Sequence, residues 1–218
     1  MAVPWYKPQV CPAIETPLEY ESQPMLDTTT TNEFLEVEFN RALDYNAYTA
    51  TGKPNQQEAF ANVYEQAQLT SAQRELLSSF VREMRVIVLS GMWCGDCVAQ
   101  VPLIARIAEA NPDKINVRYA DRDEHAELAD KVKINEGNRV PTALFMAEDH
   151  AFVHLMGDRT LSRYRAVAAR QLGASCEIPG AGVPDDEVAA CLQDWINEFE
   201  RVELLLRLSP RLRQKHND

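Results

Sequence analysis

The residues of this chain most suited to chemistry lie in the run Trp93-Cys94-Gly95-Asp96-Cys97. Two cysteines at this spacing can exchange thiols with disulfides: one ionised thiol attacks a disulfide, and the second breaks the mixed disulfide that results. At a helix start, unpaired N–H groups and the helix dipole would stabilise a Cys94 thiolate and place Cys97 one turn away. We therefore predict Cys94 as nucleophile and Cys97 as resolving thiol. Trp93 is expected to shield the sulfur, Gly95 to leave the turn uncrowded, and the Asp96 carboxylate to raise the pKa of Cys94.

Zinc binding is the main alternative for such a pair, but a structural zinc site takes four ligands. The other cysteines, Cys11, Cys176 and Cys191, form no second paired motif. His150 and His154 are four residues apart, but they fall on an expected turn and strand and would not converge on a metal. We predict no metal and no cofactor. Cys176 is interpreted as a passive surface thiol, with a third redox thiol as the alternative.

Composition narrows the classes of partner. The formal net charge of −11 disfavours nucleic acid and anionic membrane surfaces as partners. No stretch approaches the roughly 20 apolar residues that span a bilayer, and the start of the chain lacks the pattern of a secretory signal. Five cysteines with one close pair do not make the disulfide framework of a secreted scaffold. These features predict a cytoplasmic protein.

Hydrophobic patterns predict the elements that position the cysteines. A short apolar run with β-branched residues leads directly into the dithiol and is typical of a buried central strand. From residue 85 the predicted order is β-α-β-α-β-β-α, with strands at 86–89, 115–119, 143–146 and 152–155 and helices at 97–110, 123–133 and 161–172.

Further residues stand where the thioredoxin superfamily has them, and the chain resembles that superfamily over about residues 75–173. Pro102 follows the second cysteine by five residues, Val140-Pro141 precedes the predicted hairpin, and Gly157 follows it. The resemblance implies an α/β thioredoxin-like fold with a minimal four-stranded mixed sheet. It also implies that Pro141 is cis and faces the dithiol, and that the backbone of Val140 binds the substrate strand. The motif and the added helices are similar to a looser group of bacterial members.

The chain departs from that family around the dithiol. Asp96 stands where thioredoxins usually have proline. A buried aspartate and its lysine partner, which assist the resolving thiol in the family, are replaced here by Val88 and, in our alignment, Val117. Losing both charges together is consistent with the cost of a lone buried charge. This departure from the family affects the resolving step by Cys97 rather than the attack by Cys94.

Segments beyond the core complete the predicted organisation. We expect a disordered or surface-laid arm over 1–30, a helical extension over 31–74, the thioredoxin-like domain over 75–173, a linker over 174–184, and a C-terminal helix with a basic tail over 185–218. The three helices expected before residue 83 start near Thr31, at an Asn55 cap, and at a capping box of Thr70 with Gln73.

The C-terminal helix carries an apolar seam, spaced 4, 3, 4, 3, 4, at Val188, Leu192, Trp195, Phe199, Val202 and Leu206. We favour a monomer in which this seam covers the chain's own N-terminal helices, and a dimer through it is the alternative. Arg159 is interpreted as a solvated loop residue. Asp121-Arg122-Asp123 is interpreted as a strand end followed by a helix cap rather than a metal site.

Together these features predict a cytoplasmic thiol–disulfide oxidoreductase that reduces protein disulfides and is itself reduced by an upstream thiol system. The alternative is a thioredoxin-like binding or adaptor module in which the dithiol is a redox-sensitive latch.

Overall fold

The computed structural model describes residues 28–172 and 182–218, with side chains from residue 32 onward. Residues 1–27 of the predicted arm, most of the predicted linker, and Cys11 and Cys176 fall outside the described residues, whereas residues 28–30, also assigned to the arm, already belong to the first helix. The elements are α1 (Thr28–Arg41), α2 (Tyr45–Ala50), α3 (Pro54–Gln66), α4 (Ser71–Ser78), β1 (Met84–Ser90), α5 (Gly95–Ala110), β2 (Ile115–Asp121), α6 (Ala126–Lys131), β3 (Thr142–Ala147), β4 (Phe152–Gly157), α7 (Leu161–Leu172), α8 (Glu187–Leu208) and α9 (Pro210–His216).

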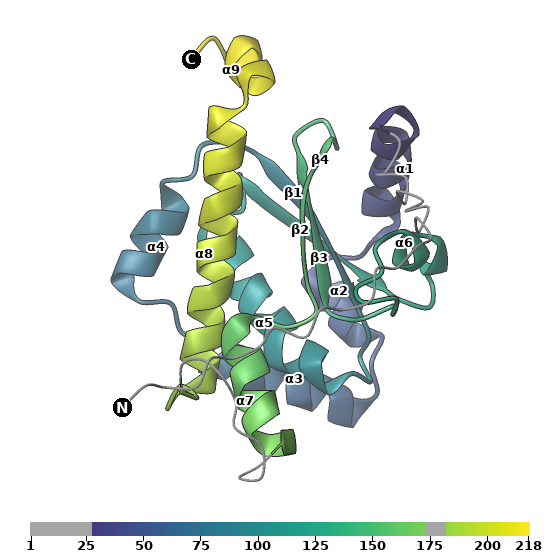
Figure 1. The fold of residues 1–218 in the computed structure, drawn as a ribbon, viewed down its shortest axis with the longest axis vertical. Helices are drawn as coiled ribbons and strands as arrows, with labels where there is room; N and C mark the ends of the chain where they lie inside the picture. The colour runs from purple at the N-terminus through teal and green to yellow at the C-terminus, as the bar shows by residue number, and fades with distance from the viewer. Residues whose placement is uncertain (1–27, 173–181) are drawn as a thin grey trace, which may run out of the picture.

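The four strands form one mixed sheet in the order β2-β1-β3-β4. β1 pairs parallel with β2 and antiparallel with β3, and β3 pairs antiparallel with β4. α5 and α8 lie on one side of the sheet, and α1 and α6 lie on the other (Figure 1). Covering on both faces explains the continuous apolar run of β1, in which only Arg85 is not buried. The predicted α/β class, the four-stranded mixed sheet and the β-α-β-α-β-β-α order of elements along the chain are confirmed.

The helical region before β1 differs from the prediction in one respect. The helix expected from Thr31 to about residue 50 is interrupted after Arg41, where Leu43 pairs with Tyr119 at the edge of the sheet. Asp44 then caps a separate helix, α2, by accepting a hydrogen bond from the Ala47 N–H at 2.8 Å. A continuous helical pattern could not reveal this break, because it depends on a contact with a strand far along the chain.

The two later N-terminal helices begin close to the expected positions. α3 starts at Pro54, with Lys53 rather than Asn55 as its N-cap. α4 has the predicted capping box: the Gln73 N–H donates to Thr70 Oγ1 at 3.2 Å, and the Thr70 N–H donates to Gln73 Oε1 at 2.8 Å.

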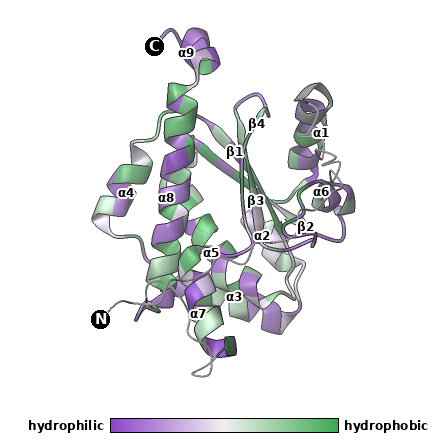
Figure 2. Cartoon of the chain, viewed as in Figure 1, coloured by the Kyte–Doolittle hydropathy of each residue, from purple (hydrophilic) through white to green (hydrophobic). Residues whose placement is uncertain are grey.

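The C-terminal helix α8 buries its apolar seam within the chain. Its alternation of apolar and polar residues is visible along the helix in Figure 2. Trp195, Phe199 and Val202 are fully buried. The helix contacts α4, which is one of the N-terminal helices, and also α5, α7 and β4. The prediction that it packs on the N-terminal helices therefore omitted its contacts with the thioredoxin-like core. No helix in residues 28–172 and 182–218 has the length and apolar character needed to cross a membrane.

Candidate active site: the Cys94–Cys97 dithiol

The dithiol lies where β1 passes into α5. β1 ends at Ser90, a tight turn follows in which the Cys94 N–H donates to the Gly91 carbonyl at 2.9 Å, and α5 begins at Gly95 with Cys94 as its N-cap. The helix therefore starts two residues before the predicted 97. Both cysteines are free thiols. Cys94 is partly exposed and Cys97 is fully buried. An incoming disulfide substrate can therefore contact the sulfur of Cys94 but not that of Cys97.

The surroundings push the pKa values of the two thiols in opposite directions. A hydrogen bond from the Cys97 side chain, together with the N–H groups of Cys97 and Asp96 in the first turn of α5, lowers the pKa of Cys94 to about 6. Burial and the Asp96 charge oppose this shift. Burial, followed by the influence of Cys94, raises the pKa of Cys97. At neutral pH the site therefore holds a thiolate on Cys94 and a protonated thiol on Cys97.

We expect the alkylation of Cys94 by iodoacetamide to rise with pH around a midpoint of about 6. The Cys97 side chain is the largest influence lowering this pKa, so Cys97→Ala should move the midpoint upward. Mass spectrometry of the Cys94 peptide across a pH series measures both midpoints. An unchanged midpoint in Cys97→Ala would show that the helix N-terminus alone stabilises the thiolate.

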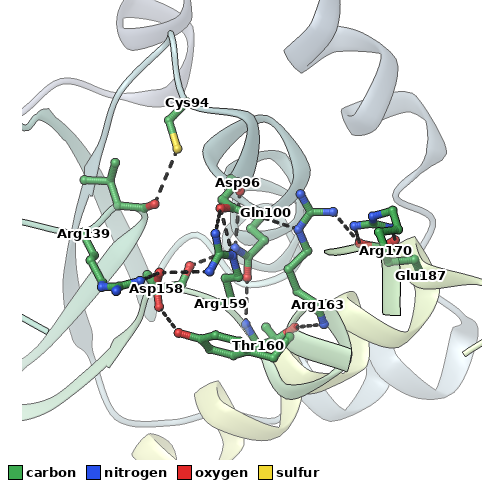
Figure 3. Close-up of polar contacts among 12 residues, drawn as sticks. Cys94, Asp96, Gln100, Arg139, Asp158, Arg159, Thr160, Arg163, Arg170 and Glu187 are labelled. Carbon is green, nitrogen blue, oxygen red and sulfur yellow. Dashed lines mark hydrogen bonds and ion pairs between the residues drawn. The ribbon is translucent and has the colours of Figure 1, made fainter. Parts of the chain in front are cut away.

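The predicted substrate-binding residues lie against the nucleophile. The Val140–Pro141 peptide bond is cis, and the Cys94 thiol donates to the Val140 carbonyl at 3.6 Å (Figure 3). A Cβ on Gly157 would lie 2.8 Å from the Pro141 carbonyl oxygen, so a glycine allows the end of β4 to approach this loop. A Cβ on Gly95 would meet nothing within 4 Å, which agrees with its predicted place in an uncrowded turn.

The Trp93 ring is partly exposed and packs on its own turn. Its side chain is 52% exposed, and its ring lies so close to the Gly91 backbone that a Cβ there would be 2.6 Å from the ring. The Arg122 guanidinium lies over the ring, 4.5 Å from its centroid. The indole therefore forms an exposed apolar surface next to Cys94 in the chain, and its predicted role in shielding the sulfur stays a prediction.

Asp96 is held by two arginines, as Figure 3 shows. Arg159 donates to Asp96 Oδ2 through Nε at 2.9 Å and Nη2 at 2.6 Å, and Arg163 donates to Oδ1 through Nε at 2.9 Å. The Asp96 side chain is only 15% exposed. The interpretation of Arg159 as a solvated loop residue is wrong, because a carboxylate from the first turn of α5 pairs with it. The pKa of Asp96 is lowered because the hydrogen bonds and charges of the two arginines outweigh its burial.

The ion pairs of Asp96 with Arg159 and Arg163 extend into a hydrogen-bond network that the sequence analysis did not predict. Gln100, buried in α5, donates to the Asp158 carbonyl at 3.0 Å and accepts from the Thr160 N–H at 3.0 Å. The Asp158 carboxylate pairs with Arg139, which directly precedes Val140, at 3.2 Å. The network therefore joins the start of α5, the end of β4 and the Val140–Pro141 loop. The only signal available in the sequence was the spacing of Arg159 and Arg163, one helical turn apart.

Asp96→Asn is expected to lower the pKa of Cys94, by less than about one unit because the site is partly exposed. The change removes a charge that raises this pKa and leaves two arginines without their carboxylate. It should also cost about 1–3 kcal/mol of unfolding free energy, since buried charged groups lose their partner. The pH dependence of Cys94 alkylation and a urea titration measure the two effects.

The matched control is Asp149→Asn, which breaks another aspartate–arginine pair, with Arg211, in the β3–β4 turn at the opposite end of the sheet. This control should leave the pKa of Cys94 unchanged. A higher pKa of Cys94 in Asp96→Asn would rule out the electrostatic role of Asp96.

The positions where thioredoxins carry the buried charges are apolar, as predicted for Val88, which is fully buried in β1. Val117, aligned with the second position, lies on the neighbouring strand β2. In the parallel register of β1 and β2, Val88 lies beside Tyr119, and Val117 lies beside Val86.

The residues considered for a metal do not form a site. His150 contacts Arg85, whereas His154 pairs with Glu198 at 2.7 Å. β2 ends at Asp121 as predicted, and Asp121 accepts the Asp123 N–H at 2.9 Å. Neither aspartate caps α6, because that helix begins at Ala126 with His125 as its N-cap. Within residues 28–172 and 182–218, no three or more His, Cys, Asp or Glu side chains form a group that could hold a metal ion.

Comparison with known proteins agrees with this geometry. Residues 42–161 match a sequence model described as thioredoxin, which is more than half of the chain. The chain belongs to the thioredoxin family. The matched segment of this thioredoxin-family protein contains the whole sheet, the dithiol and the Val140–Pro141 loop. No curated protein matches the sequence significantly.

Two solved structures share the fold over most of their length. A protein of unknown function from Pseudomonas aeruginosa is 19% identical, with a TM-score of 0.57 over 75% of this chain and 93% of that one. An HIV epitope scaffold is 19% identical, with a TM-score of 0.55 over 80% of this chain and 98% of that one. Both matches extend beyond residues 42–161, so the thioredoxin-family fold with added helices also occurs in other proteins.

Proposed function

We propose that this thioredoxin-family protein is a thiol–disulfide oxidoreductase that reduces protein disulfides, with Cys94 as nucleophile and Cys97 as resolving thiol. The observation that carries the proposal is the asymmetry of the pair. Cys94 is partly exposed at the first turn of α5, which lowers its pKa to about 6, whereas Cys97 is buried and its pKa is raised. Such a pair attacks from one sulfur and resolves from the other.

The reduction of the substrate takes place by two thiol–disulfide exchanges between the dithiol and the substrate disulfide. The Cys94 thiolate attacks one sulfur of the substrate disulfide, forming a Cys94–substrate disulfide and releasing the other substrate sulfur as a thiolate, which takes up a proton. Cys97 then loses its proton and attacks Cys94 Sγ, forming the Cys94–Cys97 disulfide and releasing the second substrate thiol. An upstream thiol reductant returns the two electrons. We place this cycle in the cytoplasm, where a thiol pool is available.

The surface around Cys94 supports a protein substrate. The exposed Trp93 ring, the open space at Gly95 and the backbone of Val140 lie beside the nucleophile. We infer that an extended segment of the substrate lies along Val140, with its sulfur at Cys94.

The proposal is tested by insulin reduction with dithiothreitol as the electron source. Catalytic turnover above the rate of dithiothreitol alone supports the reductase. Reversible oxidation of the Cys94–Cys97 pair without turnover would instead assign the domain as a binding module whose dithiol responds to redox conditions.

A further inference from the structure

Two hydroxyl groups are buried near Cys97 without hydrogen-bond partners. Ser90 is the last residue of β1, and Tyr48 belongs to α2, 42 positions earlier in the chain. Both side chains are buried, and within the described part of the chain neither Ser90 Oγ nor Tyr48 Oη makes a hydrogen bond. Burying an unpaired hydroxyl costs stability, so such a group is expected to gain a partner in another state of the protein.

The charge that would supply this partner is a thiolate on Cys97. The Ser90 hydroxyl is close enough to both neighbours to stabilise either the ionised Cys97 or the ionised Tyr48, and it lowers the pKa of each. A negative charge on Cys97 in turn raises the pKa of Tyr48. Ser90 is therefore a neighbour of both the tyrosine hydroxyl and the resolving sulfur, and a thiolate on Cys97 is a stronger acceptor for its hydroxyl than the protonated thiol.

The strand geometry places Ser90 and Tyr48 on the same side of the sheet, because Tyr119, the β2 partner of Val88, stacks on the Tyr48 ring with centroids 5.8 Å apart. Residues two apart on a strand face the same side, so Ser90 shares a face with Val88 and lies one pleat closer to the dithiol. Val88 is apolar and cannot stabilise a charge on Cys97. Along this face of β1, Met84, Val86 and Val88 are apolar, and Ser90 is the first polar side chain, directly before the turn to Cys94.

We propose that the Ser90 hydroxyl donates a hydrogen bond to the Cys97 sulfur as it becomes a thiolate and attacks the mixed disulfide, and that Tyr48 is a positioning residue that orients Ser90. The inference rests on the proposed function, because it concerns the second half of the exchange. The Cys97 proton leaves, the Cys97–Cys94 bond forms, the Cys94–substrate bond breaks, and the departing substrate thiolate takes up a proton. Ser90 and Tyr48 keep their own protons throughout. The Tyr48 hydroxyl donates one hydrogen bond to Ser90 Oγ, and the Ser90 hydroxyl donates one to the Cys97 sulfur.

Other charged or titratable groups also act at this point. Cys94, from the same helix, raises the pKa of Cys97, whereas the Gly91 backbone lowers it. Asp121, the partner of Ser90 in the β1–β2 register, raises the pKa of Tyr48. The Gly91 backbone and Asp121 stay in place when one hydroxyl is removed, and the first release in the test below reports any change at Cys94, so the two releases together isolate the proposed contribution.

The test follows the two steps separately with the aromatic disulfide DTNB, in a background with Cys11 and Cys176 replaced by serine. Attack by Cys94 releases a first coloured thiolate, and resolution by Cys97 releases a second. In Ser90→Ala the first release should keep its rate, whereas the second should slow by about tenfold at neutral pH and shift its midpoint to higher pH. Tyr48→Phe should show a smaller change of the same sign, and Ser90→Thr should restore the rate.

The matched control is Tyr119→Phe. Tyr119 is also buried, its hydroxyl also has no hydrogen-bond partner in the described chain, and its ring stacks on Tyr48 with centroids 5.8 Å apart. Loss of its hydroxyl should leave both releases unchanged. If the pH profile of the second release is the same in Ser90→Ala as in the parent, the inference is overturned while the proposed function stands. If the parent shows no first release, the proposed function itself fails.

Discussion

Cys94→Ser is expected to reduce the rate of insulin reduction to that of dithiothreitol alone, a loss of roughly 10³-fold or more. The reason is that Cys94 is the partly exposed thiol with a pKa of about 6, whereas Cys97 is fully buried and its pKa is raised. A serine hydroxyl stays protonated at neutral pH and cannot replace the thiolate as nucleophile. Turbidity of precipitating insulin chains measures the loss.

Cys97→Ser should show a different defect, because attack by Cys94 still occurs but resolution does not. Mixed disulfides between Cys94 and substrate proteins should accumulate, and non-reducing electrophoresis followed by mass spectrometry would identify them. The matched control is Cys191→Ser, since Cys191 is a buried thiol in α8 whose pKa is raised by burial. That variant should reduce insulin normally. Equal trapping by Cys94→Ser and Cys97→Ser would contradict the assignment of the two roles.

Deleting residues 185–218 is expected to abolish the stable fold. The deletion removes α8, whose buried residues Trp195, Phe199 and Val202 pack against the rest of the domain, and Phe199 makes an edge-to-face contact with Phe145 of β3 at 5.0 Å. Truncating one such aromatic costs about 3–5 kcal/mol, against a total stability of about 5–15 kcal/mol for a typical domain. The truncated chain should bind the dye ANS and lack a cooperative urea transition.

Phe199→Ala tests the same packing in a chain that can still fold, and it should lose about 3–5 kcal/mol of unfolding free energy. Leu208→Ala is the control, because Leu208 is near the end of the same helix but 72% exposed. It should change stability by less than about 0.5 kcal/mol. An unchanged melting temperature after the deletion would show that α8 is a dispensable appendage.

The amino-acid sequence is sufficient for the features that depend on local spacing. The apolar run of β1, the Cys-x-x-Cys pair at the start of α5, the Thr70–Gln73 capping box and the α8 seam all arise from residues close together in the chain. Hydrophobic periodicity and capping are local properties, so these elements lie close to their predicted positions. The sequence also favours Cys94 as nucleophile, because the stabilisation of a thiolate at a helix start is a local effect, and the roles of the two thiols stay a prediction.

The side chains that surround the dithiol from distant parts of the chain depend on the three-dimensional packing. Arg159 is 63 residues from Asp96, and the Tyr48 hydroxyl approaches Ser90 and Cys97 from a separate helix. The same holds for the interruption before α2, which follows from the pairing of Leu43 with Tyr119. Salt bridges, buried hydroxyls and edge pairings form between residues whose separation in sequence carries no periodic signal. Their partners are set by how the helices pack on the sheet, and that packing sets the environment of each cysteine.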